Sequence, residues 1–254
     1  RTETRLEGRQ NGSQLDNSRF NQQYRKGEAQ LQSAWGDTHL ATVGAGYIRE
    51  SVDANRVTGS RTGGFVFVQD EWTPTDWLDL VPSARLDAHS DYATRISPKL
   101  AALVRPVDGL RVRASVGSGY KAPAFRQLYL NFTNAQAGYT VFGAEEVRGG
   151  LDSLDANNEI AALLQDPSTL GGAMDAERSV AYNVGVRVDL PAALTLDANL
   201  YHNEVRDLID TQPVARKTNG QQIFTYFNRG RVFTQGLEAQ LTWQPRAAFD
   251  AAIS

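Results

Sequence analysis

The residues best suited to binding a ligand lie in one long segment between two regular strands. Lys121 and Arg126 are basic, and basic groups in a narrow opening concentrate an anionic ligand. Three aromatic residues follow in the same segment, Tyr129, Tyr139 and Phe142. We take these five residues as the candidate ligand-binding set. The alternative is that the two basic side chains are ordinary solvated groups.

The sequence does not indicate catalytic chemistry. The histidines, His39, His89 and His202, fall on different expected strands without zinc-protease spacing, and there is no Gly-x-Ser-x-Gly nucleophile elbow. The glycines before Lys121 lack the spacing of a phosphate-binding loop. We therefore expect no enzyme activity, no catalytic residue and no cofactor.

Metal and nucleic-acid binding are also disfavoured. An acidic cluster in the same long segment offers oxygen ligands that calcium would accept, but it lacks the spacing of an EF-hand, so no metal site is expected. A net charge of −3 and the absence of a basic stripe argue against a nucleic-acid partner. The acidic cluster comprises Glu145, Glu146, Asp152, Asp155 and Glu159.

Alternation with period two dominates the remaining sequence and predicts the strands that must position these side chains. Between Ser179 and Leu190, for example, every second residue is apolar and its neighbours are small or polar. Eleven strands are expected, with boundaries uncertain by about 2–4 residues. Their ranges are 1–9, 20–35, 38–52, 63–73, 77–90, 93–105, 109–120, 177–190, 194–208, 221–243 and 248–254.

The connections between these strands alternate between tight turns and longer loops. Tight turns are expected near 36–37, 74–76, 106–108, 191–193 and 244–247, and longer loops near 10–19, 53–62, 90–93, 121–176 and 209–220. Short turns at one end and long loops at the other are typical of transmembrane barrels. The fold class is therefore all-β, an antiparallel up-and-down transmembrane β-barrel. A soluble sandwich or propeller is the alternative.

The segment 121–176 is much longer than an ordinary connection, and loops of this size are generally functional or disordered. We interpret it as an extracellular loop that contacts the ligand, with a short helix expected over Asn158–Gln165 because of its helix-forming composition. The alternative is a loop that only packs on its neighbours.

Several ordered motifs resemble the barrel of TonB-dependent outer-membrane receptors. They are Ser97-Pro98-Lys99-Leu100, a turn ending at Gly109-Leu110, and Gly119-Tyr120-Lys121-Ala122-Pro123 before the long loop. Later, Tyr201–Ile209 and the stretch from Tyr226 through Glu238 are similar to a family strand and its return strand. The resemblance is clear from about Gly64 to Trp243.

Membership would imply a barrel of roughly 22 strands closed by an N-terminal plug, in the bacterial outer membrane, with uptake driven through TonB. Eleven strands are about half of such a barrel, so residues 1–254 are expected to be one partial barrel domain without a plug or TonB box. Half a barrel alone would leave unpaired strand edges, which are costly in lipid. The implied partners are outer-membrane lipid, TonB and a small organic ligand such as a ferric chelate.

The resemblance narrows the ligand only in part. In heme-uptake members a Phe-Arg-Ala-Pro box and an Asn-Pro-x-Leu box flank a histidine. Tyr120–Pro123 corresponds to the first box, but the second box and the histidine are missing before Val147. Heme is thus disfavoured, which leaves a ferric siderophore, cobalamin or a similar nutrient. The alternatives to uptake are a passive porin-like or adhesion β-barrel, or a soluble β-rich carbohydrate-binding domain.

Overall fold

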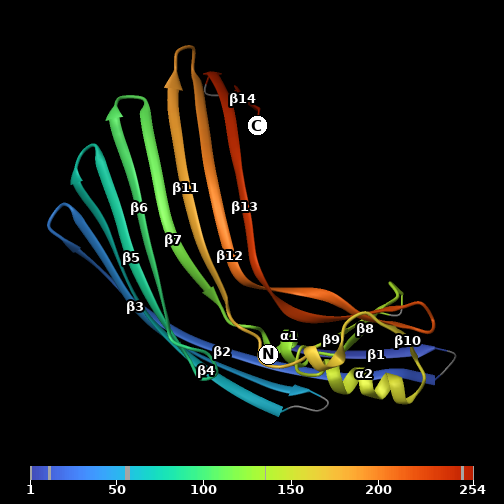
Figure 1. The fold of residues 1–254 in the computed structure, drawn as a ribbon. Coiled ribbons are helices and arrows are strands. Elements are labelled where there is room, and N and C mark those ends of the chain that lie inside the picture. The colour runs from blue at the N-terminus through green and yellow to red at the C-terminus, as the bar shows by residue number, and fades with distance from the viewer. Residues whose placement is uncertain (1, 11–12, 55–57, 135, 247–248, 254) are drawn as a thin grey trace.

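The structure, a computed structural model, describes residues 2–10, 13–54, 58–134, 136–246 and 249–253. Within them, 14 strands form one sheet, antiparallel except where β9 pairs with β13 (Figure 1). No described helix is long and apolar enough to cross a membrane. The eleven longer strands are β1 (Thr2–Gln10), β2 (Ser13–Trp35), β3 (His39–Ala54), β4 (Thr58–Thr75), β5 (Leu78–His89), β6 (Arg95–Val107), β7 (Leu110–Lys121), β11 (Glu177–Leu190), β12 (Leu194–Lys217), β13 (Gln222–Arg246) and β14 (Phe249–Ile253).

Strands β1 to β7 follow one another in the sheet, and β7 then pairs directly with β11. The residues between β7 and β11 leave the wall and form their own elements. These are α1 (Phe125–Tyr129), β8 (Phe132–Asn134), β9 (Tyr139–Phe142), α2 (Val147–Ala156), β10 (Ile160–Leu163) and the short 3-10 helix η1 (Pro167–Thr169). Within the described residues the sheet is an open wall, with β1 at one edge.

The period-two alternation gives the wall two different faces. Val184 lies opposite Ala114 and Leu200, and its side chain is 53% exposed on an apolar face. The next residue, Gly185, belongs to the polar face, where the Arg113 side chain crosses above it to reach Asp197 at 2.6 Å. The sequence therefore predicted which side chains share a face.

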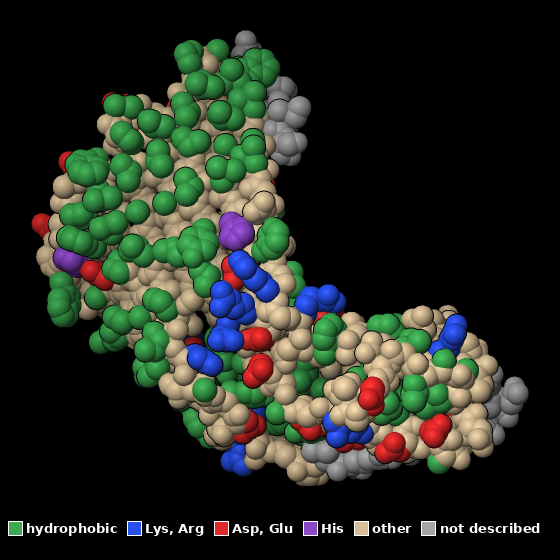
Figure 2. Space-filling model, in the orientation of Figure 1, with side chains coloured by type: hydrophobic (Ala, Val, Ile, Leu, Met, Phe, Trp, Pro, Cys, Tyr) green, Lys and Arg blue, Asp and Glu red, His purple; other side chains and the backbone are tan. Residues whose placement is uncertain are grey.

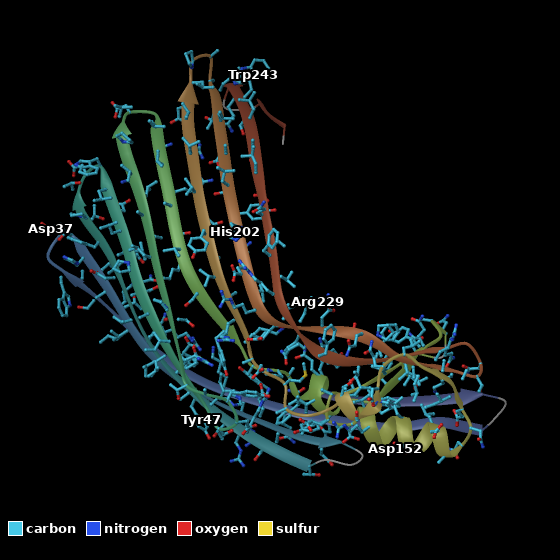
Figure 3. The ribbon with its side chains drawn as sticks, in the orientation of Figure 1. Asp37, Tyr47, Asp152, His202, Arg229 and Trp243 are labelled. Atoms are coloured by element: carbon cyan, nitrogen blue, oxygen red, sulfur yellow. The ribbon has the colours of Figure 1, made fainter. Side chains whose placement is uncertain are left out.

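The apolar face forms a belt whose height suits a bilayer. On β11 the belt runs from Val180 to Leu190, about 33 Å of strand at a rise of roughly 3.3 Å per residue. A strand tilted by about 40° lowers this to about 25 Å, the height of the apolar band of outer-membrane barrels. Exposed tryptophans, including Trp35 and Trp243, lie near the tight turns. Figure 3 labels Trp243 and Asp37 at this end of the wall.

Four of the five predicted tight turns overlap turns of the structure. The turn predicted at 244–247 is wrong over 244–246, because these residues continue β13 and Arg246 still pairs with Phe249, and residue 247 lies outside the described residues. Residues 36–38, 76–77, 108–109 and 191–193 form turns between consecutive wall strands. Gly36 and Gly109 have φ of 63° and 76°, a left-handed conformation that glycine adopts without steric cost. Ala192 and Ala193 adopt the same conformation at 62° and 59°. These turns all lie at one end of the wall, whereas α1, α2 and their neighbours lie at the other (Figure 1).

Most of the predicted long loops are instead strand, which corrects the prediction for 10–19, 53–62 and 209–220. Strand β2 begins at Ser13, β3 extends to Ala54, β12 extends to Lys217 and β13 begins at Gln222. These extensions were missed because strands that rise beyond a bilayer have no apolar face to produce alternation. Residues 11–12 and 55–57, within two of the predicted loops, lie outside the described residues.

Strands β12 and β13 bend together and extend as an arm away from the wall. Asp207, at the bend, has φ of 56°, and pairing resumes beyond it between Leu208 and Arg229. Figure 3 labels Arg229 at this bend, and Figure 1 shows the arm turning toward the end that carries α2.

The helix predicted over Asn158–Gln165 is wrong. Residues Ile160–Leu163 are strand β10, which pairs with Ala215–Lys217 of the arm, so sheet pairing overrides their helical propensity. The helix instead spans Val147–Ala156, where two glycines weaken the signal. One of them, Gly150, lies beneath the ring of Phe142, and a Cβ there would come within 2.7 Å of that ring.

Candidate functional site

Residues 122–176, termed here the outer segment, pack in hydrophobic cores that they share with the arm and the wall. In the main cluster Phe142, Val147 and Leu151 pack against Val214 and Ile223 of the arm. Val147, Val214 and Ile223 are fully buried. The outer segment is therefore a packed unit joined to the arm, and not a structureless connection.

Lys121 marks the base of the outer segment. Its ammonium group lies 3.0 Å from the carboxylate of Glu177, so the last residue of β7 is joined to the first residue of β11. The same carboxylate accepts a 3.0 Å hydrogen bond from the backbone N–H of Ile209, beside the bend of β12. Lys121 thus joins the two wall strands that flank the outer segment, although its side chain remains 58% exposed.

Arg61 of β4 anchors the beginning of the outer segment to the wall. Its guanidinium donates to Glu50 at 2.7 Å and to the carbonyl of Pro123 at 2.7 Å. It also lies 4.3 Å from the centre of the Phe125 ring, in a cation–π arrangement. Only 6% of the Arg61 side chain is exposed, so this buried cation is satisfied on all sides by the wall strand and the outer segment.

Asn228 of β13 anchors the end of the outer segment. Its side-chain amide donates to the carbonyl of Asp175 at 2.9 Å and accepts from the N–H of the same residue at 2.8 Å. It also donates to the carbonyl of Asp207 at 2.7 Å. One side chain therefore connects the outer segment to both strands of the bend.

Phe142 lies in the core of the outer segment. It is 9% exposed, its ring covers Gly150, and its carbonyl accepts a 3.0 Å hydrogen bond from the buried hydroxyl of Thr225. In this conformation Phe142 holds β9 against the arm, and its ring is not presented to a ligand.

The remaining candidate residues differ in how far they are accessible. Arg126 is exposed on α1. Tyr129 is half-buried, 6.0 Å from the Phe125 ring, and burial raises the pKa of its hydroxyl. Tyr139 contacts the rings of Phe132 and Phe224 edge-on. Tyr129 therefore packs against two clusters, one with Val52 of β3 and one with Ile209 of β12, whereas Tyr139 lies beside the arm.

The acidic residues of the outer segment do not converge. In the part of the chain that the structure describes, no three or more His, Cys, Asp or Glu side chains gather as metal ligands. Asp152 extends outward from α2 (Figure 3).

The anchors of the outer segment were missed by the sequence predictions. Arg61 fell within a predicted loop, and no sequence signal pairs it with Pro123, which lies 62 residues further along. Asn228 belongs to a stretch quoted for the family resemblance, and that resemblance is the signal that could have marked it.

An antiparallel wall with one apolar face, tight turns at one end and a folded segment at the other defines part of a transmembrane β-barrel. The comparisons with known proteins specify it further: residues 2–254 match the family described as "TonB dependent receptor-like, beta-barrel". The chain belongs to the TonB-dependent receptor family, and its location is the bacterial outer membrane.

Named relatives agree with this family. The iron-regulated outer membrane virulence protein of Vibrio cholerae is 22% identical over 161 residues, which cover 61% of this chain and 24% of that protein. The siderophore receptor PirA from Pseudomonas aeruginosa has the same fold, with a TM-score of 0.68 at 19% identity over 93% of this chain and 42% of that one.

Two further solved structures share the fold. The ferric enterobactin receptor PfeA from Pseudomonas aeruginosa, a mutant in complex with enterobactin, gives a TM-score of 0.64 at 18% identity, covering 92% of this chain and 35% of that one. The hemophore receptor HasR of Serratia marcescens, a double mutant in complex with its hemophore and heme, gives a TM-score of 0.59 at 17% identity, covering 89% of this chain and 40% of that one. The chain thus spans less than half the length of each relative.

Proposed function

We propose that this chain forms part of the barrel of a TonB-dependent receptor that takes up a ferric siderophore or a similar organic nutrient. The observation that carries the proposal is the outer segment, a folded unit held to the wall by Arg61 and to the arm by Asn228. The titles of the related structures support the ligand class, since they describe a siderophore receptor and a ferric enterobactin receptor.

The outer segment is suited to first contact with an anionic chelate. Arg126 is exposed on α1, and the half-buried rings of Tyr129 and Tyr139 lie on the same folded segment. A guanidinium donates several hydrogen bonds to carboxylate or catecholate oxygens, while a tyrosine offers apolar area and a hydroxyl. Lys121 and Phe142 then act indirectly, by holding the base and the core of the outer segment.

Uptake is tested in a strain that lacks the complete receptor gene and carries it on a plasmid, in TonB-positive and TonB-negative backgrounds. Radioactive iron is supplied on a panel of siderophores, with cobalamin and heme measured in parallel. We expect accumulation of at least one ferric siderophore only when both the receptor and TonB are present. Accumulation that continues without TonB would support a passive barrel and overturn the proposal.

The ligand contact is tested by Arg126→Gln in the same strain. We expect weaker binding of the accepted ferric siderophore, by about tenfold, because one charge-assisted hydrogen bond is removed. Arg216→Gln is the matched control, since it removes the same charge from an exposed arginine of the arm. An equal loss in both variants would mean that general charge, rather than a contact at Arg126, determines binding.

A further inference from the structure

Strands β6 and β7 separate at their outer ends. Within the described residues, their last ladder pair on that side joins Lys99 to Gly117. Residues 95–98 of β6 and 118–121 of β7 lie beyond it and are not paired with each other, while each strand stays paired with its other neighbour, β5 or β11 (Figure 1). Pro98, directly beyond the last pair, has no N–H with which to extend the ladder. The opening between these two segments is termed here the slit.

A groove opens at the slit on the apolar face of the wall and is termed here the apolar groove. It has a volume of about 420 Å³, and Ile96, Val180 and Tyr182 form the apolar part of its lining. Ile96 is 68% exposed, and Val180 and Tyr182 continue the row of Val184 on the belt. Figure 2 shows this face, with Lys and Arg gathered directly beyond the hydrophobic side chains. The apolar groove is therefore continuous with the surface that contacts the acyl chains of the outer leaflet.

A second depression lies on the opposite, polar face of the same part of the wall and is termed here the polar pocket. Leu86 is exposed on the belt, so the next residue of β5, Asp87, belongs to the polar face. The polar pocket has a volume of about 220 Å³, and its lining includes Asp87, Phe65 opposite it on β4, Tyr24 and His89. It therefore combines a carboxylate, a hydroxyl and an imidazole with aromatic surface.

Tyr120 of β7 lines both depressions. A side chain that lines a depression on each face stands in the wall between them. Its hydroxyl oxygen is buried and has no hydrogen-bond partner among the described residues, and the same is true of the hydroxyl of Ser118. Buried polar groups are normally paired, so two unpaired hydroxyls in one place are unusual. Both can donate a hydrogen bond to a carbonyl group that lies in the slit.

The slit thus connects three kinds of surface in order: a polar and aromatic pocket, two hydroxyl donors and a hydrocarbon surface. A molecule that complements all three has a polar head, a carbonyl linkage and a hydrocarbon tail. A membrane lipid matches only the apolar groove, because its headgroup and its tails both lie on the lipid side. Arg178 and Arg206 line the far part of the apolar groove, and each is already paired with a carboxylate.

We propose that the slit admits the acyl tail of an amphiphilic ferric chelate, whose head lies on the polar face with one edge in the polar pocket. The tail passes through the slit into the apolar groove and the outer leaflet. This inference rests on the proposed uptake function and specifies its substrate class, an acylated siderophore. The Tyr120 ring rotates about its side-chain bonds to let the tail pass, and the hydroxyls of Tyr120 and Ser118 donate to the carbonyl of the acyl linkage.

The test compares chelates with and without a tail, in the strain that lacks the complete receptor gene and carries it on a plasmid. A trishydroxamate, a triscatecholate and an α-hydroxycarboxylate chelate of radioactive iron are each supplied as the free head and as its dodecanoyl derivative. The measurement is the concentration that gives half-maximal receptor-dependent accumulation of iron. We expect this concentration to be about tenfold lower for at least one dodecanoyl derivative than for its own free head, because burial of methylenes adds affinity.

Receptor variants separate the slit from simple partition of the tail into the bilayer, which is the same for every variant. Tyr120→Trp fills the slit and is expected to remove the roughly tenfold advantage of the tail while accumulation of the free head stays unchanged. Tyr47→Trp is the matched control, since Tyr47 is exposed on the wall and does not line the apolar groove. If Tyr120→Trp does not insert, Ile96→Trp is compared with Leu237→Trp: the two side chains are 68% and 67% exposed, and Ile96 lines the apolar groove whereas Leu237 does not.

A diazirine next to the acyl carbonyl records where the tail lies. We expect photoadducts on the peptides that contain Ile96 or Val180. Adducts spread along the belt, or equal losses in Tyr120→Trp and Tyr47→Trp, would overturn the inference. Accumulation of free heads with no gain from any tail would refute the slit and leave the proposed function intact, whereas no receptor-dependent accumulation of any chelate would refute both.

Discussion

Replacement of Arg61 by methionine tests whether one buried cation holds the outer segment to the wall. The replacement removes the 2.7 Å hydrogen bond to the Pro123 carbonyl and the cation–π contact with Phe125. A hydrogen bond from a charged donor contributes about 1.5–3 kcal/mol, and a partly desolvated cation–π contact about 0.5–2 kcal/mol. Together they amount to roughly 2–5 kcal/mol of attachment.

In Arg61→Met, hydration of Glu50 recovers part of this free energy of attachment. Glu50, the ion-pair partner, is 16% exposed and gains water once Arg61 is absent, so its unpaired charge costs less than that of a fully buried carboxylate. We therefore expect the lower end of the range, about 2 kcal/mol. Since 1.4 kcal/mol corresponds to a factor of ten, the detached population of the first part of the outer segment rises about thirtyfold.

Amide hydrogen exchange on the full-length receptor measures this population. The amides of Leu128 and Leu130 are bonded within or just after α1, and that of Ala144 donates to the carbonyl of Gln127. All three are expected to exchange about thirtyfold faster in Arg61→Met, while amides in the middle of β11 remain protected. The exchange rates in Arg61→Lys are expected to lie between those of wild type and Arg61→Met, because lysine keeps the charge but lacks the planar guanidinium.

The control is Arg113→Met, which breaks the ion pair with Asp197 on the polar face and touches no residue of the outer segment. Exchange in α1 that is unchanged in a correctly folded Arg61→Met would refute the reasoning. Equal acceleration in Arg113→Met would also refute it, because the effect would then come from the wall as a whole.

Two further results are expected from the same geometry. Gly150→Ala places a Cβ within 2.7 Å of the Phe142 ring and should destabilise the outer segment by about 1–3 kcal/mol, which limited proteolysis would detect as faster cleavage. A second substitution in the same chain, Phe142→Leu, should restore resistance to the protease. A Gly150→Ala variant as resistant as wild type would contradict this packing. Burial beside His89 raises the pKa of Tyr92 from 10.0 to about 12, so the stabilising contribution of Tyr92 is complete below pH 10 and is lost as the pH rises through about 12. An ultraviolet difference titration of wild type against Tyr92→Phe should show the ionisation step of Tyr92 near pH 12. A step near pH 10 would contradict this prediction.

The wall could be predicted from the sequence because its physical cause is local. A bilayer on one side and a polar interior on the other require alternation with period two, and this pattern is visible wherever both environments are present, as between Val180 and Leu190. The same pattern ends where a strand leaves the bilayer, and therefore the continuation of β12 to Lys217 was missed. The five candidate ligand residues lie in the outer segment or, for Lys121, directly before it, and their contact with a ligand stays a prediction.

The sequence by itself determined the type of protein: long alternating strands, tight turns at one end, one oversized outer segment and motifs that resemble a receptor family. Only the tertiary structure decided which residues hold that segment. The partners of Arg61 are Glu50 on the neighbouring strand and Pro123, 62 residues along the chain, and no periodicity encodes such a contact. The alignment of three arginines across adjacent strands has the same origin, because Arg178, Arg206 and Arg231 become neighbours only through the register of β11, β12 and β13. Composition and spacing describe the neighbours of a residue along the chain, whereas ion pairing and burial depend on its neighbours in the folded structure.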